Sequence, residues 1–238
     1  MNMKGIMLCG GDATRLGALT KVTNKHLLPV GNKVMCQHPL ETLVRLGITQ
    51  ICVVIGGRNT GKFTEFLGDG SEFGAEIYYR YQGKPLGISH AIAECEDFCT
   101  DSRFVVILGD NIFKGDVESL NERQHPGGAT IVLSKTSTPE RFGIAKLLDG
   151  DVVDIVEKPK KYVSNYAVTG LYFFSNVFFQ HFHQTFRSAR GEYEIVDVLN
   201  CYREADSLFY RIFDGEWTDA GTPESLKAAN DMMRGDKP

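Results

Sequence analysis

The chain has 238 residues, 42% of them hydrophobic and 24% charged, with a net charge of −4 at pH 7. This length and composition suit a globular protein with a sizeable core, and the acidic balance argues against a general nucleic-acid binder. No apolar run is long enough to cross a membrane, and the first residues enter an expected strand without a signal-peptide pattern. The sequence therefore predicts a cytoplasmic protein.

Strand and helix patterns alternate in the first half of the chain. Runs typical of buried strands occupy residues 3–9, 50–55, 75–81 and 103–108. Helical spacing of apolar residues covers 36–46, 59–67 and 87–98. This order predicts an α/β fold with a mostly parallel sheet and helices on both faces, in which ligands bind at the carboxyl ends of the strands.

The second half is less regular. We expect strands at 129–135, 144–148, 152–157, 167–174 and 208–213, and helices at 192–205 and 222–233. The aromatic-rich stretch 171–182 is most simply core. Repeats, low-complexity segments and linkers are absent, which favours one domain over residues 1–238.

Cysteine and histidine offer little chemistry. The only close pair, Cys95 and Cys99, has no second Cys or His pair beside it at zinc-ligand spacing. We expect all six cysteines to be reduced and mostly buried. The six histidines are scattered, and no Ser-His-Asp or Cys-His arrangement is present.

The first strand runs into the turn Gly10-Gly11-Asp12-Ala13-Thr14-Arg15. Glycines let backbone N–H groups approach an anion, and Arg15 and Lys25 could neutralise it. The turn is neither a Walker A loop nor Gly-x-Gly-x-x-Gly. The motif therefore favours phosphate binding, while a tight strand-to-helix turn is the simpler alternative.

Two aspartates are candidate ligands of Mg²⁺. Asp110 directly follows the expected strand 103–108, and Asp219 precedes the expected last helix. Mg²⁺ prefers one or two carboxylates together with phosphate oxygens. An ordinary turn aspartate and an ordinary loop aspartate remain the alternatives.

Three further groups are candidate binding residues. Glu157 and Lys158 end an expected strand, where a carboxylate can accept sugar hydroxyls and an ammonium can meet a phosphate. Arg190 could supply a second cation. Gln82 and Gly87 border a loop that enters a helix and suit the edge of a nucleobase, although a capped loop explains them equally well.

Together these segments resemble the sugar-1-phosphate nucleotidylyltransferases, most closely the glucose-1-phosphate thymidylyltransferase branch. The resemblance runs over nearly the whole chain. It rests on the following motifs: Gly10-Gly11 to Arg15-Leu16, Lys25 to Pro29, Leu108-Gly109-Asp110-Asn111, Arg141-Phe142-Gly143, Glu157-Lys158-Pro159-Lys160, Val168-Thr169-Gly170-Leu171-Tyr172, Arg190-Gly191-Glu192 and Trp217-x-Asp219-x-Gly221. It implies a Rossmann-like sheet with an integrated sugar-binding portion, the nucleotide part spanning about 1–115 and the sugar part about 116–238.

The resemblance also implies a reaction and a set of roles. An NTP, with dTTP favoured, and a hexose-1-phosphate, with glucose-1-phosphate favoured, would give an NDP-sugar and pyrophosphate by in-line attack. Arg15 and Lys25 would stabilise the phosphates, and Asp110 and Asp219 would hold Mg²⁺. The nucleotide would contact Gly10, Gly11, Asp12, Ala13, Thr14, Gln82 and Gly87. The sugar phosphate would contact Asn111, Gly143, Glu157, Lys158, Val168, Tyr172, Arg190 and Trp217.

Two departures from the family pattern carry expectations of their own. Asp12-Ala13 stands where the family usually has a small neutral residue and glycine, so an added negative charge affects NTP affinity or nucleotide choice. Longer members of the branch continue with carboxyl-terminal helices that build a second nucleotide site, so we expect weak or absent feedback control here. The resemblance implies a homo-oligomer. The alternatives are another NTP or sugar phosphate, and a non-catalytic sensor of nucleotide or NDP-sugar.

Overall fold

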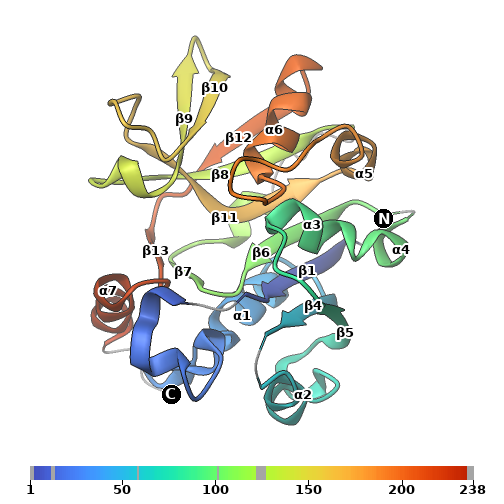
Figure 1. Ribbon diagram of the computed structural model, residues 1–238, viewed down its shortest axis with the longest axis vertical. Coiled ribbons are helices and arrows are strands. Elements are labelled where there is room, and N and C mark those ends of the chain that lie inside the picture. The colour runs from blue at the N-terminus through green and yellow to red at the C-terminus, as the bar shows by residue number, and fades with distance from the viewer. Residues whose placement is uncertain (1–2, 12–13, 58, 101, 122–126, 235–238) are drawn as a thin grey trace.

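The computed structural model describes residues 3–11, 14–57, 59–100, 102–121 and 127–234. Its first half forms four parallel strands in the order β6-β1-β4-β5 (Figure 1). The strands are β1 (Lys4–Cys9), β4 (Gln50–Gly56), β5 (Glu76–Gln82) and β6 (Phe104–Leu108). Because the chain leaves β1 for β4 on one side and reaches β6 on the other, the carboxyl end of β1 is a topological switch point.

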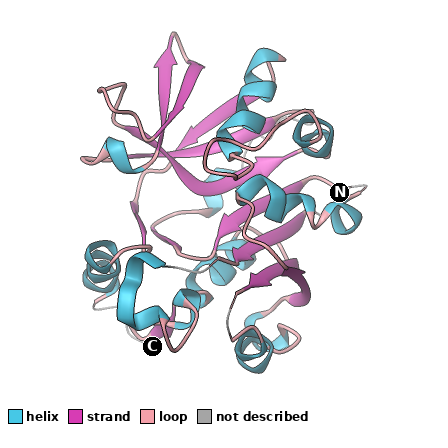
Figure 2. Cartoon of the chain, viewed as in Figure 1, coloured by secondary structure: helices cyan, strands magenta, loops and turns pink. Residues whose placement is uncertain are grey.

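Helices cover both faces of this sheet (Figure 2). One face packs against α1 (Gln37–Arg45) and α2 (Gly61–Leu67), through Leu40, Leu43 and Phe63 among others. The opposite face packs against α3 (Ile88–Ala93), α4 (Glu96–Cys99), α5 (Val177–Phe182) and α6 (Ile195–Glu204). Alternate residues of β1, Ile6 on one side and Met7 on the other, enter the two cores, as the period of a strand requires.

The second half extends the sheet with antiparallel pairs. Strand β11 (Tyr166–Phe174) pairs antiparallel with β6, β8 (Ala129–Lys135) and β9 (Gly143–Leu148). Strand β10 (Asp151–Glu157) forms a hairpin with β9, and β12 (Leu208–Ile212) runs parallel to β8. In Figure 1 these strands lie above the parallel ones, together with α5 and α6.

Two small ladders complete the fold. Strand β7 (Asn111–Lys114) pairs with β13 (Glu216–Asp219), and β2 (Pro29–Val30) pairs with β3 (Lys33–Val34). Helix α7 (Pro223–Met233) begins with a capping box between Thr222 and Ser225 and packs beside the amino-terminal segment through Ala229 (Figure 1). Five 3₁₀ helices span Thr14–Thr20, Lys25–Leu27, Ser71–Phe73, Glu118–Asn121 and Pro139–Arg141.

The structure confirms the expected α/β class with a parallel core and helices on both faces. The expected helix 87–98 is instead divided into α3 and α4, because Cys95 leaves helical geometry at φ −106° and ψ 16°. Part of the aromatic stretch 171–182 forms α5, which buries Phe178 and Phe179. All six cysteines are free thiols, and five are buried, as expected. None of the helices in the described residues is long and apolar enough to span a membrane.

Candidate active site

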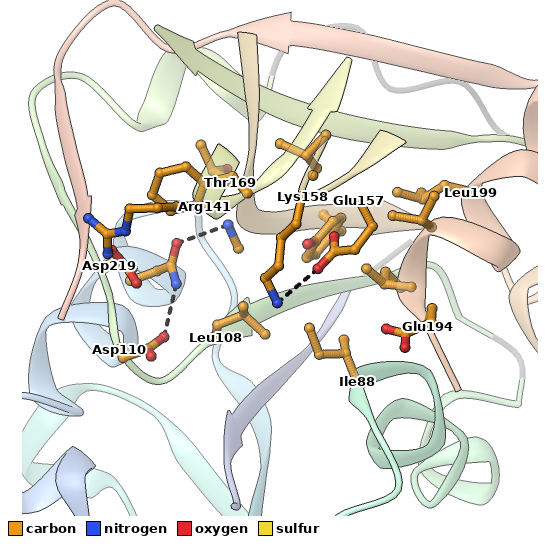
Figure 3. Close-up of a pocket in the computed structure, with 18 of the residues that line it drawn as sticks. Ile88, Leu108, Asp110, Arg141, Glu157, Lys158, Thr169, Glu194, Leu199 and Asp219 are labelled. Atoms are coloured by element: carbon orange, nitrogen blue, oxygen red, sulfur yellow. Dashed lines mark hydrogen bonds and ion pairs between the residues drawn. The ribbon is translucent and has the colours of Figure 1, made fainter. Parts of the chain in front are cut away.

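Two adjoining cavities open at the carboxyl ends of β1 and β6. The larger cavity has a volume of about 490 Å³ and the smaller about 260 Å³. The cavities share Arg15, Ile88, Leu108, Asp110 and Glu192. Figure 3 shows the larger cavity, with side chains reaching it from β6, β10, β11, α3, α6 and β13.

These cavities bring together all the candidate residues except Asp12, Ala13 and Thr14. The smaller cavity is lined by Gly10, Gly11, Arg15, Lys25, Gln82, Gly87 and Asp110. The larger cavity is lined by Asn111, Gly143, Glu157, Lys158, Val168, Tyr172, Arg190, Trp217 and Asp219. Asp12 and Ala13 lie outside the described residues, and Thr14 begins the short 3₁₀ helix after them.

Close backbone packing shapes the smaller cavity. Gly11 adopts φ 96°, a conformation that favours glycine. A Cβ added to Gly10 would lie 3.1 Å from Oε1 of the buried Gln82, whose Nε2 lies 3.2 Å from Nδ1 of His90. A Cβ on Gly87, at φ 102°, would lie 2.5 Å from the carbonyl oxygen of Tyr193. Glycine is therefore required at position 87 and favoured at positions 10 and 11.

Asp110 is a buried carboxylate that bonds with Lys25. The Lys25 Nζ lies 2.5 Å from Asp110 Oδ2, and the two side chains are only 13% and 10% exposed. Asn111 Nδ2 donates to Asp110 Oδ1 at 3.0 Å. Burial opposes ionisation, but the charge of Lys25 and these hydrogen bonds hold the pKa of Asp110 well below its usual value. Asp110 is therefore ionised at neutral pH.

Asp219 ends strand β13 and forms an ion pair with a different cation. Arg141 Nη2 donates to Asp219 Oδ1 at 3.0 Å. Burial and the nearby charge of Asp110 raise the pKa of Asp219 above its usual value. A Cβ placed on Gly221 would lie 3.1 Å from Asp219 Oδ2, 3.1 Å from Arg15 Nη2 and 3.3 Å from Asp110 Oδ2. These three charged groups therefore converge on one point.

The two aspartates are the candidate metal ligands in this region. The described residues contain no cluster of three or more His, Cys, Asp or Glu side chains that could hold a metal ion by themselves. A pair of carboxylates nevertheless suits Mg²⁺, which takes its remaining ligands from phosphate oxygens and water. The donor set of Asp110 and Asp219 therefore fits a metal that arrives with a phosphorylated substrate.

Asn111, in the lining of the larger cavity, connects β7 with β11 and β13 through side-chain hydrogen bonds. Its Oδ1 accepts the indole N–H of Trp217 at 2.7 Å and the backbone N–H of Gly170 at 2.9 Å, and its Nδ2 donates to Asp110. A Cβ on Gly170 would lie 2.7 Å from the side-chain amide of Asn111. Only glycine therefore lets the backbone of β11 pass this close to Asn111. Asn111 and Trp217 are both candidate residues that line the cavity, and their polar side-chain atoms bond to each other.

The far end of the larger cavity is strongly charged. Glu157 Oε1 lies 3.2 Å from Lys158 Nζ and 3.7 Å from Arg190 Nη2. Lys158 adopts φ 45°, an uncommon conformation for a residue with a side chain, and its backbone N–H donates to the carbonyl of Phe142 at 2.9 Å. A Cβ on Gly143 would lie 3.3 Å from Glu157 Oε2. Two cations and a carboxylate are thus held together beside an open volume.

An apolar wall faces these charges. Leu108, Ile88, Val196, Leu199 and the buried Tyr172 line it, three of them labelled in Figure 3. Burial raises the pKa of Tyr172, so its hydroxyl stays protonated. A cavity with an apolar wall and a few polar groups is typical of a small-molecule site.

Several cavity residues were not among the candidates, including Arg141, Thr169 and Glu194. Arg141 and Thr169 lie inside the quoted motifs Arg141-Phe142-Gly143 and Val168-Thr169-Gly170, and that membership was the available signal. Glu194 lies two residues beyond Arg190-Gly191-Glu192. Local sequence gives no indication that its side chain turns into the cavity.

Comparisons with known proteins identify the family of this chain. A sequence model of the family described as nucleotidyl transferase matches residues 4–235. The chain therefore belongs to the nucleotidyl transferase family.

Its relatives narrow the assignment. A glucose-1-phosphate thymidylyltransferase of Neisseria meningitidis serogroup A is 40% identical over 238 residues, covering 98% of this chain and 83% of the relative. The low-salt glycan biosynthesis nucleotidyltransferase Agl11 of Haloferax volcanii is 40% identical over 239 residues, covering 99% of this chain and 67% of the relative. A Bacillus anthracis crystal structure with sucrose, provisionally described as a glucose-1-phosphate thymidylyltransferase, matches with a TM-score of 0.94 and 44% identity, covering 99% of this chain and 97% of that one. These matches confirm the sequence-based prediction of a sugar-1-phosphate nucleotidylyltransferase similar to the glucose-1-phosphate thymidylyltransferases.

Proposed function

We propose that the chain transfers the thymidylyl group of dTTP to glucose-1-phosphate, giving dTDP-glucose and pyrophosphate. An oxygen of the sugar phosphate bonds to the α-phosphorus, and the bond from that phosphorus to the oxygen bridging to the β-phosphate breaks. The observation that supports this proposal best is the convergence of Arg15, Asp110 and Asp219 at the junction of the two cavities. An α-phosphate of the nucleotide placed at that junction would lie beside the phosphate of the sugar substrate.

Charge repulsion is the main obstacle to this reaction, because the sugar phosphate and the triphosphate are both anionic. Fixed cations and backbone N–H groups address repulsion and alignment together. Arg15 and Lys25 line the smaller cavity beside the Gly10-Gly11 turn, where they would stabilise the triphosphate and the departing pyrophosphate. A general base is unnecessary, because a phosphate monoester is largely ionised near neutral pH.

Asp110 and Asp219 would hold Mg²⁺. The metal, when bound, would neutralise phosphate charge and help to align the reacting oxygens. In the protein alone, Lys25 and Arg141 offset the two carboxylates.

The larger cavity suits the sugar phosphate. Lys158 and Arg190 would bind its phosphate, and Glu157 would accept hydrogen bonds from sugar hydroxyls. Because Gly143 has no side chain, the Glu157 carboxylate has room beside it. Val168 and Tyr172 would pack against the sugar ring. Gln82 and Gly87, in the smaller cavity, would contact the pyrimidine.

A panel assay tests this proposal. Purified protein is incubated with each of the common NTPs and several hexose-1-phosphates, with and without Mg²⁺, and pyrophosphate release is measured. We expect release with dTTP and glucose-1-phosphate that EDTA abolishes and Mg²⁺ restores. Release with a different pair would correct the substrates, and no release with any pair at high enzyme concentration would defeat the proposal.

A further inference from the structure

Glu194 holds Arg190 in a defined orientation. Arg190 Nη2 donates to Glu194 Oε2 at 2.6 Å, and Arg190 Nε donates to Glu194 Oε1 at 3.1 Å. A guanidinium carries five N–H donors in a rigid plane, and this side-on pair uses the Nε edge. Among the described residues no hydrogen bond engages Nη1, so that end of the guanidinium is available to another acceptor.

Glu194 is itself firmly fixed. Ser188 Oγ donates to Glu194 Oε1 at 2.6 Å, and the side chain is only 16% exposed. Its backbone occupies the N-cap position of α6, and its carbonyl accepts from Ser89 Oγ of α3 at 3.1 Å. Ser188 therefore holds the carboxylate and Ser89 holds the backbone of the same residue, so an arginine bonded to this carboxylate is preorganised.

A second carboxylate competes for the same arginine. Glu157 Oε1 lies 3.7 Å from Arg190 Nη2, farther than the Glu194 contacts. Without the Glu194 charge, the guanidinium would move toward Glu157, which is the side chain that the sugar hydroxyls require. The contacts with Glu194 therefore hold Arg190 back from a closer ion pair with Glu157.

We propose that Glu194 is a positioning residue, which aims Arg190 at the phosphate of the sugar substrate and keeps it away from Glu157. This inference rests on the proposed function, because it assigns a role within the same site. It predicts that Glu194 acts only through Arg190 and makes no contribution of its own to nucleotide binding.

Steady-state kinetics of Glu194→Gln test whether Glu194 supports binding of the sugar phosphate. We expect the KM for glucose-1-phosphate to rise about tenfold, because the variant loses the charge-assisted hydrogen bonds that orient Arg190. The KM for dTTP should change by less than about twofold. Glu194→Asp, which keeps the charge on a shorter side chain, should recover part of the loss. The matched control is Glu204→Gln at the other end of α6, whose side chain is 71% exposed and pairs with its neighbour Arg203 at 3.4 Å.

A double-mutant cycle tests whether Glu194 acts only through Arg190. If Glu194 acts through Arg190, then Arg190→Ala/Glu194→Gln is no weaker for glucose-1-phosphate than Arg190→Ala alone. Additive losses, or an equal rise in the KM for dTTP, would overturn the positioning role. Thermal unfolding of each variant separates a local effect from general destabilisation.

Calorimetric titration with glucose-1-phosphate keeps the two proposals distinguishable. Turnover by the wild-type protein with unaltered kinetics of Glu194→Gln overturns the inference and leaves the proposed function standing. A wild-type protein that binds glucose-1-phosphate without turnover fails the proposed function, and the binding cycle then decides the inference. Absence of both turnover and binding overturns both.

Discussion

The side-chain oxygen of Asn111 accepts the indole N–H of Trp217 at 2.7 Å, across 106 residues of chain. The same oxygen accepts the N–H of Gly170, and the same amide donates to Asp110. One amide therefore connects the wall of the larger cavity to a candidate metal ligand. Trp217 is the only tryptophan of the chain, which makes this connection observable by fluorescence.

Titration with glucose-1-phosphate is expected to change the intrinsic tryptophan emission in a saturable way, because Trp217 lines the cavity proposed for the sugar. Trp217→Phe removes the signal and one hydrogen bond, at a cost of about 1 kcal/mol in the free energy of unfolding. Urea unfolding measures that cost. Unchanged emission at a sugar-phosphate concentration that saturates a calorimetric titration would contradict this placement of the sugar.

Gly221→Ala is expected to lower activity by more than about tenfold with little loss of stability. The new methyl group would lie 3.1 Å from both Arg15 and Asp219 and 3.3 Å from Asp110, and would push these charged groups apart. Gly61→Ala is the matched control, because a Cβ at the start of α2 meets no atom within 4 Å. Pyrophosphate release and thermal unfolding of the two variants check the contrast. Equal activities would show that the convergence point has no role in the reaction.

Lys25→Met is expected to destabilise the protein by about 3–5 kcal/mol, because it leaves the charge of Asp110 buried without its partner. Mg²⁺ should then raise the melting temperature of the variant more than that of the wild type, since the cation replaces the lost ammonium. Thermal unfolding with and without Mg²⁺ measures this difference independently of activity.

Lys62→Met serves as its control, because the Lys62–Glu65 pair is 63% and 68% exposed and should contribute little. An identical response of Lys25→Met and wild type to Mg²⁺ would argue against Asp110 as a metal ligand.

Stability is expected to fall as the pH falls from about 7 to 5, through His26. Burial and the charge of Lys25 lower the pKa of His26 from 6.5 to about 3. Between these values the unfolded chain binds the proton and the folded chain does not. Each pH unit of acidification below 6.5 therefore removes up to about 1.4 kcal/mol.

Urea unfolding at several pH values measures this slope. His26→Gln should flatten it, whereas His183→Gln should not, because His183 is 62% exposed. A slope that survives in His26→Gln would assign the dependence to another group.

Cys201 is expected to be the first cysteine alkylated in the folded protein at pH 8. It is half-buried, whereas the other five are buried, and burial raises the pKa of Cys36 and of Cys99 to about 12. Mass spectrometry after a short iodoacetamide pulse identifies the modified residue. Early modification of Cys36 or Cys99 would show that the core opens more readily than this packing implies.

The parallel core could be predicted from sequence because its strands are continuous apolar runs, the signature of strands buried on both faces. Residues 50–55 and 103–108 are such runs, and each lies within one residue of the observed strand at either end. The candidate residues also lie together, because carboxyl ends of parallel strands share one edge of the sheet. Their individual roles remain predictions.

The small ladders could not be predicted. Strands β7 and β13 have four residues each, and their pairing joins positions more than a hundred residues apart, so no local periodicity marks them. The Glu194–Arg190 contact was missed for a similar reason. Its geometry depends on Ser188 and Ser89, which belong to the loop and the helix packed against it.

The ladder between β7 and β13 sets the order in which the site can form. It aligns Asn111 with Asp219, so the two carboxylates belong to segments made far apart in time during synthesis. A nascent chain can complete the parallel core and the Gly10-Gly11 turn early. The second aspartate joins Asp110 only after residue 219 has left the ribosome and β13 has paired, so the paired acidic centre forms after the parallel core has been made.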